Sequence, residues 1–203
     1  QSSVPILGIN LGRIGFMTEL KSEDAIDQVP AFIQGDGWIE ERAMIQAELV
    51  TKSVPPFYAL NDVVVGRGGK CRLIRVEAKV DGEIVTKYKS DGVIVATATG
   101  STGYSLATGG PILHPAAREI VLQPIAPHLS FDKTLILPPD AVVELEVGTT
   151  HEALLSIDGQ IEEPLNDNDI VKIRRSPYVT RLMRSKHSAS FYRTLLKRLE
   201  KRE

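Results

Sequence analysis

Residues 97–111, TATGSTGYSLATGGP, combine seven hydroxyl side chains with four glycines. The run GVIVA at residues 92–96 precedes them and is typical of a buried strand. A short helix is expected over about residues 102–108, ended by Gly109 and Gly110. Main-chain N–H groups at a helix start, glycines and hydroxyls can together bind a phosphate or nucleotide. A capped turn without a ligand has the same composition, so local chemistry leaves both interpretations open.

Three other positions carry polar groups next to apolar runs. Asn61 and Asp62 begin the strand-like run in ALNDVVV, where polar side chains without partners are unfavourable. They either form an Asx-type turn or bind ligand hydroxyls such as those of a ribose. Asp91, directly before GVIVA, and Asp158, in Asp158-Gly159, are either turn residues or carboxylates directed into a site.

Motif spacing argues against several kinds of site. The P-loop pattern GxxxxGK[ST] and the nucleophile pattern GxSxG are absent. Gly8, Gly12 and Gly15 follow the spacing GxxxGxxG instead of the dinucleotide fingerprint GxGxxG, which favours a tight turn at a strand end. The four histidines lack ligand spacing and no CxxC occurs, so no protein-bound metal is expected.

Composition narrows the functional class further. The net charge of −2 gives no basic field, so nucleic acid is not an expected partner. No apolar run approaches the roughly 20 residues of a membrane-spanning helix, so no membrane partner is expected. Cys71 is the single cysteine, which excludes an internal disulfide and fits a reducing, cytoplasmic location.

Short alternating strands dominate the middle of the chain. Residues 72–80 alternate apolar and charged side chains, and Asp81-Gly82 then joins them to 84–88 in a hairpin. A second hairpin is expected with strands at 154–157 and 160–161, joined by Asp158-Gly159. Further strands are expected at 4–10, 39–50, 61–65, 120–123, 142–147 and 170–174, a pattern that favours an antiparallel sandwich.

Helices are expected near both ends. Residues 22–34 have one apolar face, with Ser22 as the N-cap and Pro30 as a defect. Residues 187–203 form an amphipathic helix with basic residues toward its end. The expected fold class is α+β: a fragment of an α/β domain (1–36), an antiparallel β-sandwich domain (37–186) and a C-terminal helix (187–203) that packs back on the first part.

Taken in order, four motifs resemble the ATP-NAD kinase family over nearly the whole chain. They are PILGINLGRIGFMTEL, ALNDVVV, SDGVIVATATGSTGYSLATGGPIL and SIDGQ, and the terminal HSASFYRTLLKRL resembles the family's closing helix. The resemblance implies a kinase that transfers the γ-phosphoryl group of ATP, with a divalent metal such as Mg²⁺, to the 2′-hydroxyl of the adenosine ribose of NAD. It also implies an α/β domain followed by a sandwich, in a homodimer or homotetramer.

The resemblance also implies a set of NAD-binding residues. Asn61 and Asp62 would contact the ribose and adenine, Asp91 would reach the dinucleotide near a subunit boundary, and Phe16 would pack against a base. Asp62 and Ala107 replace residues that are usually glutamate and serine in the family, which removes one ligand hydroxyl at Ala107. The full implied set is Phe16, Asn61, Asp62, Arg72, Lys89, Asp91, Thr102, Gly103, Tyr104, Ser105, Leu106, Ala107, Ala126 and Gln160, with Asp158 as a possible ligand neighbour.

The family's GGDG motif, which carries the aspartate taken as the catalytic base, does not occur in the 203 residues. We therefore expect no catalytic residue within this sequence, and expect that aspartate upstream of it. Two alternatives stay open: a non-catalytic dinucleotide-binding module, and a lipid-kinase-like relative of the same fold. A β-sandwich interaction domain is the interpretation that uses local physics alone.

Overall fold

The structure is a computed structural model that describes residues 4–12, 17–69, 72–185 and 191–199. Phe16 and Cys71, which figure in the sequence analysis, lie outside the described residues. The chain divides into two compact units, one formed by residues 1–42 and 179–203 and the other by residues 43–178.

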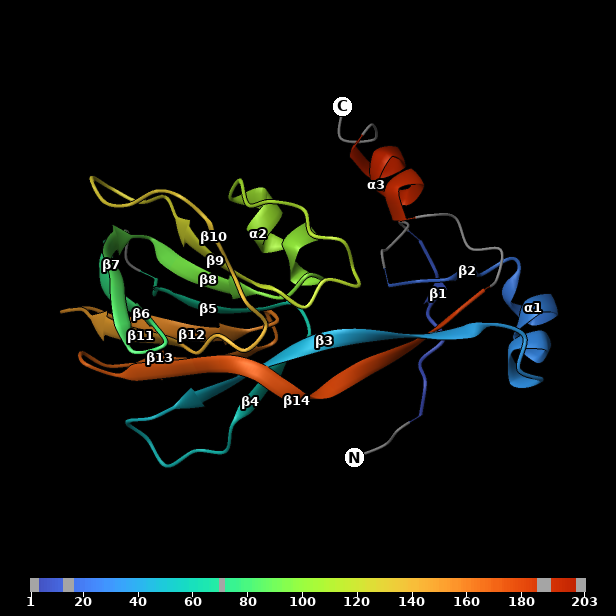
Figure 1. The fold of residues 1–203 in the computed structure, drawn as a ribbon, viewed down its shortest axis with the longest axis horizontal. Helices are drawn as coiled ribbons and strands as arrows, with labels where there is room; N and C mark the ends of the chain where they lie inside the picture. The colour runs from blue at the N-terminus through green and yellow to red at the C-terminus, as the bar shows by residue number, and fades with distance from the viewer. Residues whose placement is uncertain (1–3, 13–16, 70–71, 186–190, 200–203) are drawn as a thin grey trace. The chain divides into compact units, whose positions relative to one another are not determined.

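Two six-stranded sheets make up most of the chain (Figure 1). The first contains, in spatial order, β10 (Leu135–Leu137), β9 (Ile120–Ile125), β8 (Gly92–Ala96), β5 (Asp62–Arg67), β12 (Ala153–Ile157) and β13 (Ile161–Leu165). The second contains β4 (Phe57–Ala59), β3 (Trp38–Leu49), β14 (Ile170–Arg184), β11 (Val143–Gly148), β6 (Ile74–Val80) and β7 (Glu83–Ser90). Neighbouring strands of the first sheet all run antiparallel, and the expected α+β class is confirmed.

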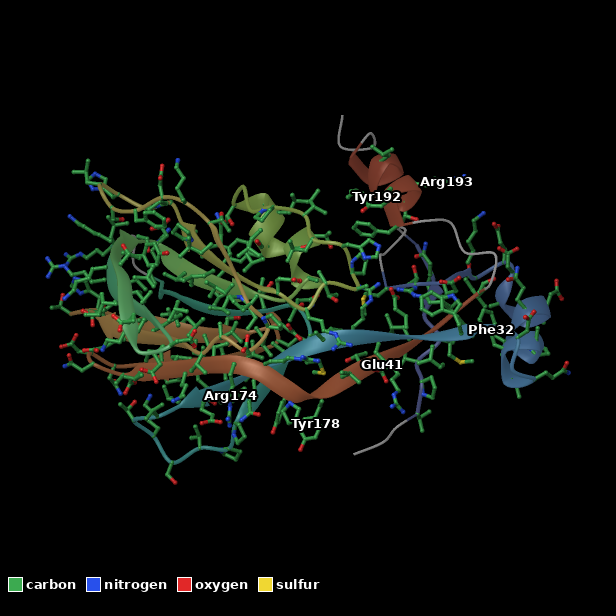
Figure 2. The ribbon with its side chains drawn as sticks, viewed as in Figure 1. Phe32, Glu41, Arg174, Tyr178, Tyr192 and Arg193 are labelled. Carbon is green, nitrogen blue, oxygen red and sulfur yellow. The ribbon has the colours of Figure 1, made fainter. Side chains whose placement is uncertain are left out.

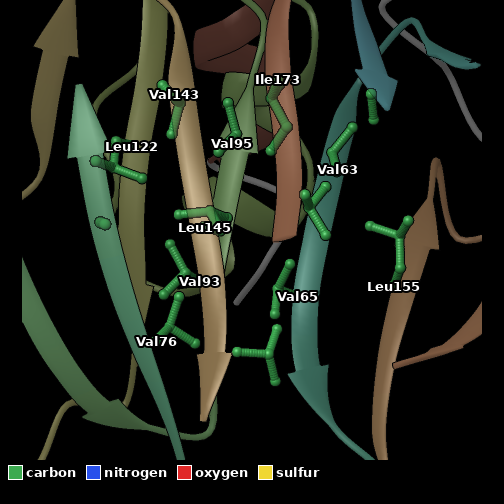
Figure 3. Packing of buried hydrophobic residues seen from close by; sticks show 14 of the residues in the cluster. Val63, Val65, Val76, Val93, Val95, Leu122, Val143, Leu145, Leu155 and Ile173 are labelled. Carbon is green, nitrogen blue, oxygen red and sulfur yellow. The ribbon is translucent and has the colours of Figure 1, made fainter. Parts of the chain in front are cut away.

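The main core of residues 43–178 forms between the inner faces of the two sheets (Figure 3). Val63 and Val65 on β5 and Val93 and Val95 on β8 are fully buried there. Side chains on a strand alternate between faces, so every second residue reaches this layer. Leu145 on β11 faces them from the second sheet, which explains the strict alternation of the sequence in that strand.

The outer face of the second sheet carries paired charges. Lys79 lies 3.2 Å from Glu77 and 3.4 Å from Glu146. Arg174 on β14 pairs with Glu48 on β3 at 2.7 Å (Figure 2). Such exposed pairs contribute little to stability individually, so the alternation mainly keeps this face polar.

The first sheet is covered on its outer face as well, and this determines where the site forms. Ile94 and Ala96 on β8 pack with Val121 and Ile125 on β9 in a second, smaller core. A 3-10 turn (Gly100–Thr102) and the short helix α2 (Tyr104–Ala107) follow β8, and α2 lies over this side of the sandwich (Figure 1). Burial on both faces explains why GVIVA is apolar throughout.

Both expected hairpins form, with one difference. Asp81 and Gly82 have positive φ angles of 52° and 86° and make the two-residue turn between β6 and β7. Between β12 and β13 the loop has three residues, because Ile157 pairs with Ile161 and Gln160 belongs to the turn. The expectation that Gln160 begins the second strand is therefore wrong.

The unit formed by residues 1–42 and 179–203 has short strands β1 (Ile9–Asn10) and β2 (Leu20–Lys21), which pair in parallel. Helix α1 (Ala25–Ile33) contains Pro30 and buries Phe32. Its N-cap is Asp24, so the expectation of a cap at Ser22 is wrong. Helix α3 (Phe191–Leu199) lies within the range expected for the closing helix.

Tyr88 gives a stability prediction, because its hydroxyl is buried and has no hydrogen-bond partner among the described residues. Desolvation raises the pKa of this phenol to about 12. An unsatisfied buried hydroxyl is unfavourable by about 1–3 kcal/mol. Tyr88→Phe is therefore expected to keep or raise the free energy of unfolding in urea titrations. A clear loss of stability would mean that the hydroxyl has a partner in solution.

Candidate functional site

The main chain of residues 60–62 is held by two other residues. The carboxylate of Asp158 accepts hydrogen bonds from the N–H groups of Leu60, Asn61 and Asp62 at 2.8, 2.7 and 3.0 Å. Thr97 donates through its hydroxyl to the carbonyl of Leu60 at 2.6 Å and through its N–H to that of Asn61 at 2.9 Å. Asp158 N–H donates to the carbonyl of Asp62 at 3.0 Å. All six main-chain polar groups of this segment are thus satisfied.

The side chains of Asn61 and Asp62 remain available. Neither side chain makes a hydrogen bond to any described residue. The Asp62 carboxylate lies beside the turn before α2, since a Cβ built on Gly103 would be 4.0 Å from its Oδ2 atom. An amide and a carboxylate on a fixed main chain can together donate to and accept from a ligand's hydroxyl groups.

Asp62 has an unusual electrostatic environment. Its side chain is buried, with 6% of its surface exposed, and the described residues place no cation in contact with it. Desolvation, with a smaller contribution from the charge of Asp158, raises the pKa of Asp62 to about 6. A carboxylate in this condition gains more from a ligand hydroxyl than an exposed one would.

Most hydroxyls of residues 97–111 hold the segment itself. Ser101 donates to the carbonyl of Ala98 at 2.7 Å and accepts from the N–H of Leu113 at 3.0 Å. The hydroxyl of Thr102 donates to the carbonyl of Thr99 at 3.2 Å. The hydroxyl of Thr108 donates to the carbonyl of Ser105 at 2.9 Å. The turn interpretation therefore accounts for these hydroxyls. The helix expected over 102–108 is interrupted at Gly103, where φ is −96° and ψ is −124°.

Ser105 differs from the other hydroxyls. It is fully buried, and its Oγ has no hydrogen-bond partner among the described residues. A Cβ on Gly110 would lie 2.3 Å from this oxygen, so Gly110 leaves the space that the Ser105 side chain occupies.

A cavity of about 370 Å³ opens on the outer face of the first sheet, beside α2. Gly66 on β5 lines this cavity, and a Cβ there would meet no atom closer than 3.8 Å, so the missing side chain leaves space. Arg67 and Asp91 form an ion pair of 2.8 Å at this cavity, and Tyr104 contributes an exposed ring. The lining residues are Val64, Gly66, Arg67, Gly68, Asp91, Tyr104, Ile125, Leu154, Ser156 and Glu162.

The structure brings together only part of the implied NAD-binding set. Asp91 and Tyr104 share the cavity, and Ala126 directly follows Ile125 at its edge. Leu106 and Ala107 lie on α2, and Gln160 is exposed in the turn beside Asp158.

Arg72 and Lys89, which belong to the implied set, do not line this cavity, and three polar residues that line it are not in the set. Arg72 contacts His151 at 2.8 Å, and Lys89 lines a hollow of about 440 Å³ on the second sheet. The sequence analysis missed Arg67, Ser156 and Glu162. The alternation of β12 was a usable signal for Ser156, because it places that residue on the face opposite the core.

The described part of the chain contains neither a metal-binding cluster nor a membrane-spanning helix. No group of three or more His, Cys, Asp or Glu side chains there is placed to hold a metal ion. No helix in the same ranges is long and apolar enough to cross a membrane.

Comparisons with known proteins agree on one family. Residues 60–185 match the model of the ATP-NAD kinase C-terminal domain. The chain is 46% identical over 195 residues to an NAD kinase of Dehalococcoides mccartyi strain CBDB1, covering 95% of this chain and 69% of that protein. It is 41% identical to an NAD kinase of Heliobacterium modesticaldum, covering 97% of this chain and 70% of that one.

Solved structures give the same result. A yeast NADH kinase complexed with NADH superimposes with a TM-score of 0.88 at 28% identity, over 97% of this chain and 58% of that one. An Archaeoglobus fulgidus NAD kinase in complex with ATP superimposes with a TM-score of 0.81 at 27% identity, over 97% of this chain and 74% of that one.

Proposed function

The chain belongs to the ATP-NAD kinase family, and we propose that it is the dinucleotide-binding part of an enzyme that makes NADP from NAD and ATP. The observation that carries the proposal is the pair Asn61 and Asp62. Their main chain is fixed by Asp158 and Thr97, and their side chains are free beside the turn at Gly103. A rigid amide–carboxylate pair suits the adjacent hydroxyl groups of a ribose.

The proposed reaction transfers the γ-phosphoryl group of ATP to the 2′-hydroxyl of the adenosine ribose. A divalent cation such as Mg²⁺ arrives with the ATP phosphates, whose charge it neutralises. We propose that residues 43–178 contribute the acceptor site, with Asn61 and Asp62 at the ribose and Asp91 and Tyr104 at the cavity beside it. The GGDG aspartate is not among the 203 residues. The enzyme is further proposed to be a cytoplasmic homo-oligomer.

The test uses the full-length protein with NAD, ATP and Mg²⁺. Calorimetry measures NAD binding, and a coupled dehydrogenase assay specific for NADP measures the product. Formation of NADP that depends on ATP supports the kinase. Binding of NAD without any NADP formation would replace the kinase by a non-catalytic dinucleotide-binding module, and phosphorylation of a lipid alcohol would indicate a lipid-kinase-like relative.

Asn61→Ala separates a ligand role from a turn role. The side chain makes no hydrogen bond to the described residues, so the free energy of unfolding should change by no more than about 0.5 kcal/mol. NAD affinity should fall about ten-fold, which is the contribution of one good hydrogen bond. Calorimetry and thermal denaturation measure the two effects. Asn166→Ala, in the exposed turn before β14, is the control and should change neither. A large loss of stability with normal binding would favour the turn role.

A further inference from the structure

We propose that Asp158 is the positioning residue of the dinucleotide site: its carboxylate fixes the main chain of residues 60–62 so that Asn61 and Asp62 face the ligand before it binds. This inference rests on the proposed function, and it assigns to Asp158 a role through the main chain instead of a contact with the ligand.

Asp158 accepts three hydrogen bonds from one segment of the main chain. Both carboxylate oxygens of Asp158 are used, Oδ2 by Leu60 and Oδ1 by Asn61 and Asp62, at distances of 2.7 to 3.0 Å. A carboxylate accepts from N–H groups more strongly than a neutral oxygen does. The three donors are consecutive, so the contact orients the peptide planes on both sides of Asn61 and thereby the directions of both side chains.

A turn of the same local sequence makes fewer such contacts. Asp81-Gly82 and Asp158-Gly159 both place an aspartate at positive φ, 52° and 51°, followed by glycine. Asp81 accepts one main-chain hydrogen bond, at 2.8 Å from Val142, which directly precedes the neighbouring strand β11. Asp158 accepts three from a segment 96 to 98 residues away. Hairpin geometry alone therefore does not account for the contacts of Asp158.

The carboxylate of Asp158 lies near a second carboxylate, that of Asp62. The described surroundings of Asp158 supply no cation to its carboxylate, and its charge lies close enough to Asp62 to help raise the pKa of that group. Two carboxylates at close range repel each other, yet the main-chain contacts hold them together. An arrangement needed only for a turn would not require the second carboxylate.

The test compares Asp158→Asn with Asp81→Asn in the full-length protein. Asparagine tolerates positive φ and keeps the size of the side chain, but it removes the charge and one acceptor oxygen. Asp158→Asn is expected to raise the Kd for NAD at least about ten-fold, the effect of losing hydrogen bonds to a charged group. Asp81→Asn is expected to lower the melting temperature about as much as Asp158→Asn does. It should leave the Kd for NAD unchanged.

Three results decide the matter, and one of them needs no ligand. NMR titration of Asp62 should show a lower pKa in Asp158→Asn than in the wild type, because the variant removes a neighbouring negative charge; an unchanged pKa would show that Asp158 does not lie beside Asp62 in solution and would overturn the inference. Wild-type binding of NAD with an unchanged Kd in Asp158→Asn overturns this inference and leaves the proposed function intact. Failure of the wild type to bind NAD overturns both.

A measurement on the wild type covers the case in which Asp158→Asn does not fold. Hydrogen exchange at the amides of residues 60–62 should be as slow without NAD as with it, because Asp158 holds these amides in the free protein. Fast exchange that becomes slow only when NAD binds would show that the ligand organises the segment, and the inference would be wrong.

Discussion

The Asp62→Asn variant is expected to melt at a higher temperature than the wild type at pH 8 and to bind NAD about ten- to a hundred-fold more weakly. Both effects have one cause, because the carboxylate of Asp62 is buried without a cation or a hydrogen-bond donor among the described residues. A charge in that position is unfavourable in the free protein, while a ligand hydroxyl that donates to it gains about 1.5–3 kcal/mol.

The sign of the pH dependence follows from the raised pKa. Asp62 titrates at about 6 in the folded protein and at 3.8 as the reference value. The folded state therefore holds the proton more tightly, and the associated stability is present in full below about pH 4 and is lost as pH rises through 6. The difference between the two pKa values corresponds to at most ~3 kcal/mol at pH 8. Asparagine removes this dependence.

Thermal denaturation of both proteins between pH 4 and pH 8 measures the effect. The gain in melting temperature of Asp62→Asn should be largest at pH 8 and should vanish near pH 4. Asp132→Asn is the control, because Asp132 is exposed and pairs with the neighbouring Lys133. A variant that is less stable than the wild type at every pH would show that Asp62 has a donor partner in solution.

Ligand binding should show the opposite dependence. A hydroxyl donor favours the ionised carboxylate, so NAD affinity of the wild type should rise as pH increases through about 6. Calorimetry at several pH values should show this rise, and Asp62→Asn should not show it. This dependence distinguishes a ligand contact at Asp62 from a general effect on folding.

Much of the fold could be predicted because it depends on local patterns. Alternation identified β6 and β11, and the apolar GVIVA identified β8 as a buried strand. Strand β14 extends to Arg184, ten residues beyond the expected end at Arg174. Its later residues include Ser176 and Pro177, which weaken the strand pattern, so that pairing in the sheet decides their conformation.

The site was less predictable, because its decisive contacts join residues far apart in sequence. Asp81-Gly82 and Asp158-Gly159 are indistinguishable as local motifs. Only the pairing of β12 with β5 in the sheet brings Asp158 to residues 60–62. Thr97 likewise reaches Leu60 across 37 residues, a contact that the composition of residues 97–111 does not reveal. Asn61 and Asp62 could be predicted as a candidate ligand-binding pair because they are adjacent in the sequence. The groups that fix their main chain could not be predicted.

Gly100→Ala is expected to have the largest effect on stability, and to disturb the site as well. A Cβ at residue 100 would lie 2.0 Å from the carbonyl oxygen of Asn61 and 2.8 Å from its Cα. The neighbour cannot move freely, because that oxygen accepts the Thr97 N–H and the Asn61 N–H is bound to Asp158. Overpacking against main chain usually destabilises by about 1–3 kcal/mol, and we expect the upper end or beyond.

The expected loss corresponds to a fall in melting temperature of about 6–12 °C, since 1 kcal/mol shifts a protein of this size by about 2–4 °C. Gly69→Ala is the matched control, because a Cβ there meets no atom within 4 Å. Any relief of the clash must displace the Asn61 carbonyl, so the protein that remains folded should also bind NAD more weakly. A Gly100→Ala protein with normal stability but lost binding would show that the segment shifts instead of unfolding. A normal melting temperature together with normal NAD affinity would mean that residues 97–103 lie farther from Asn61 than the structure places them.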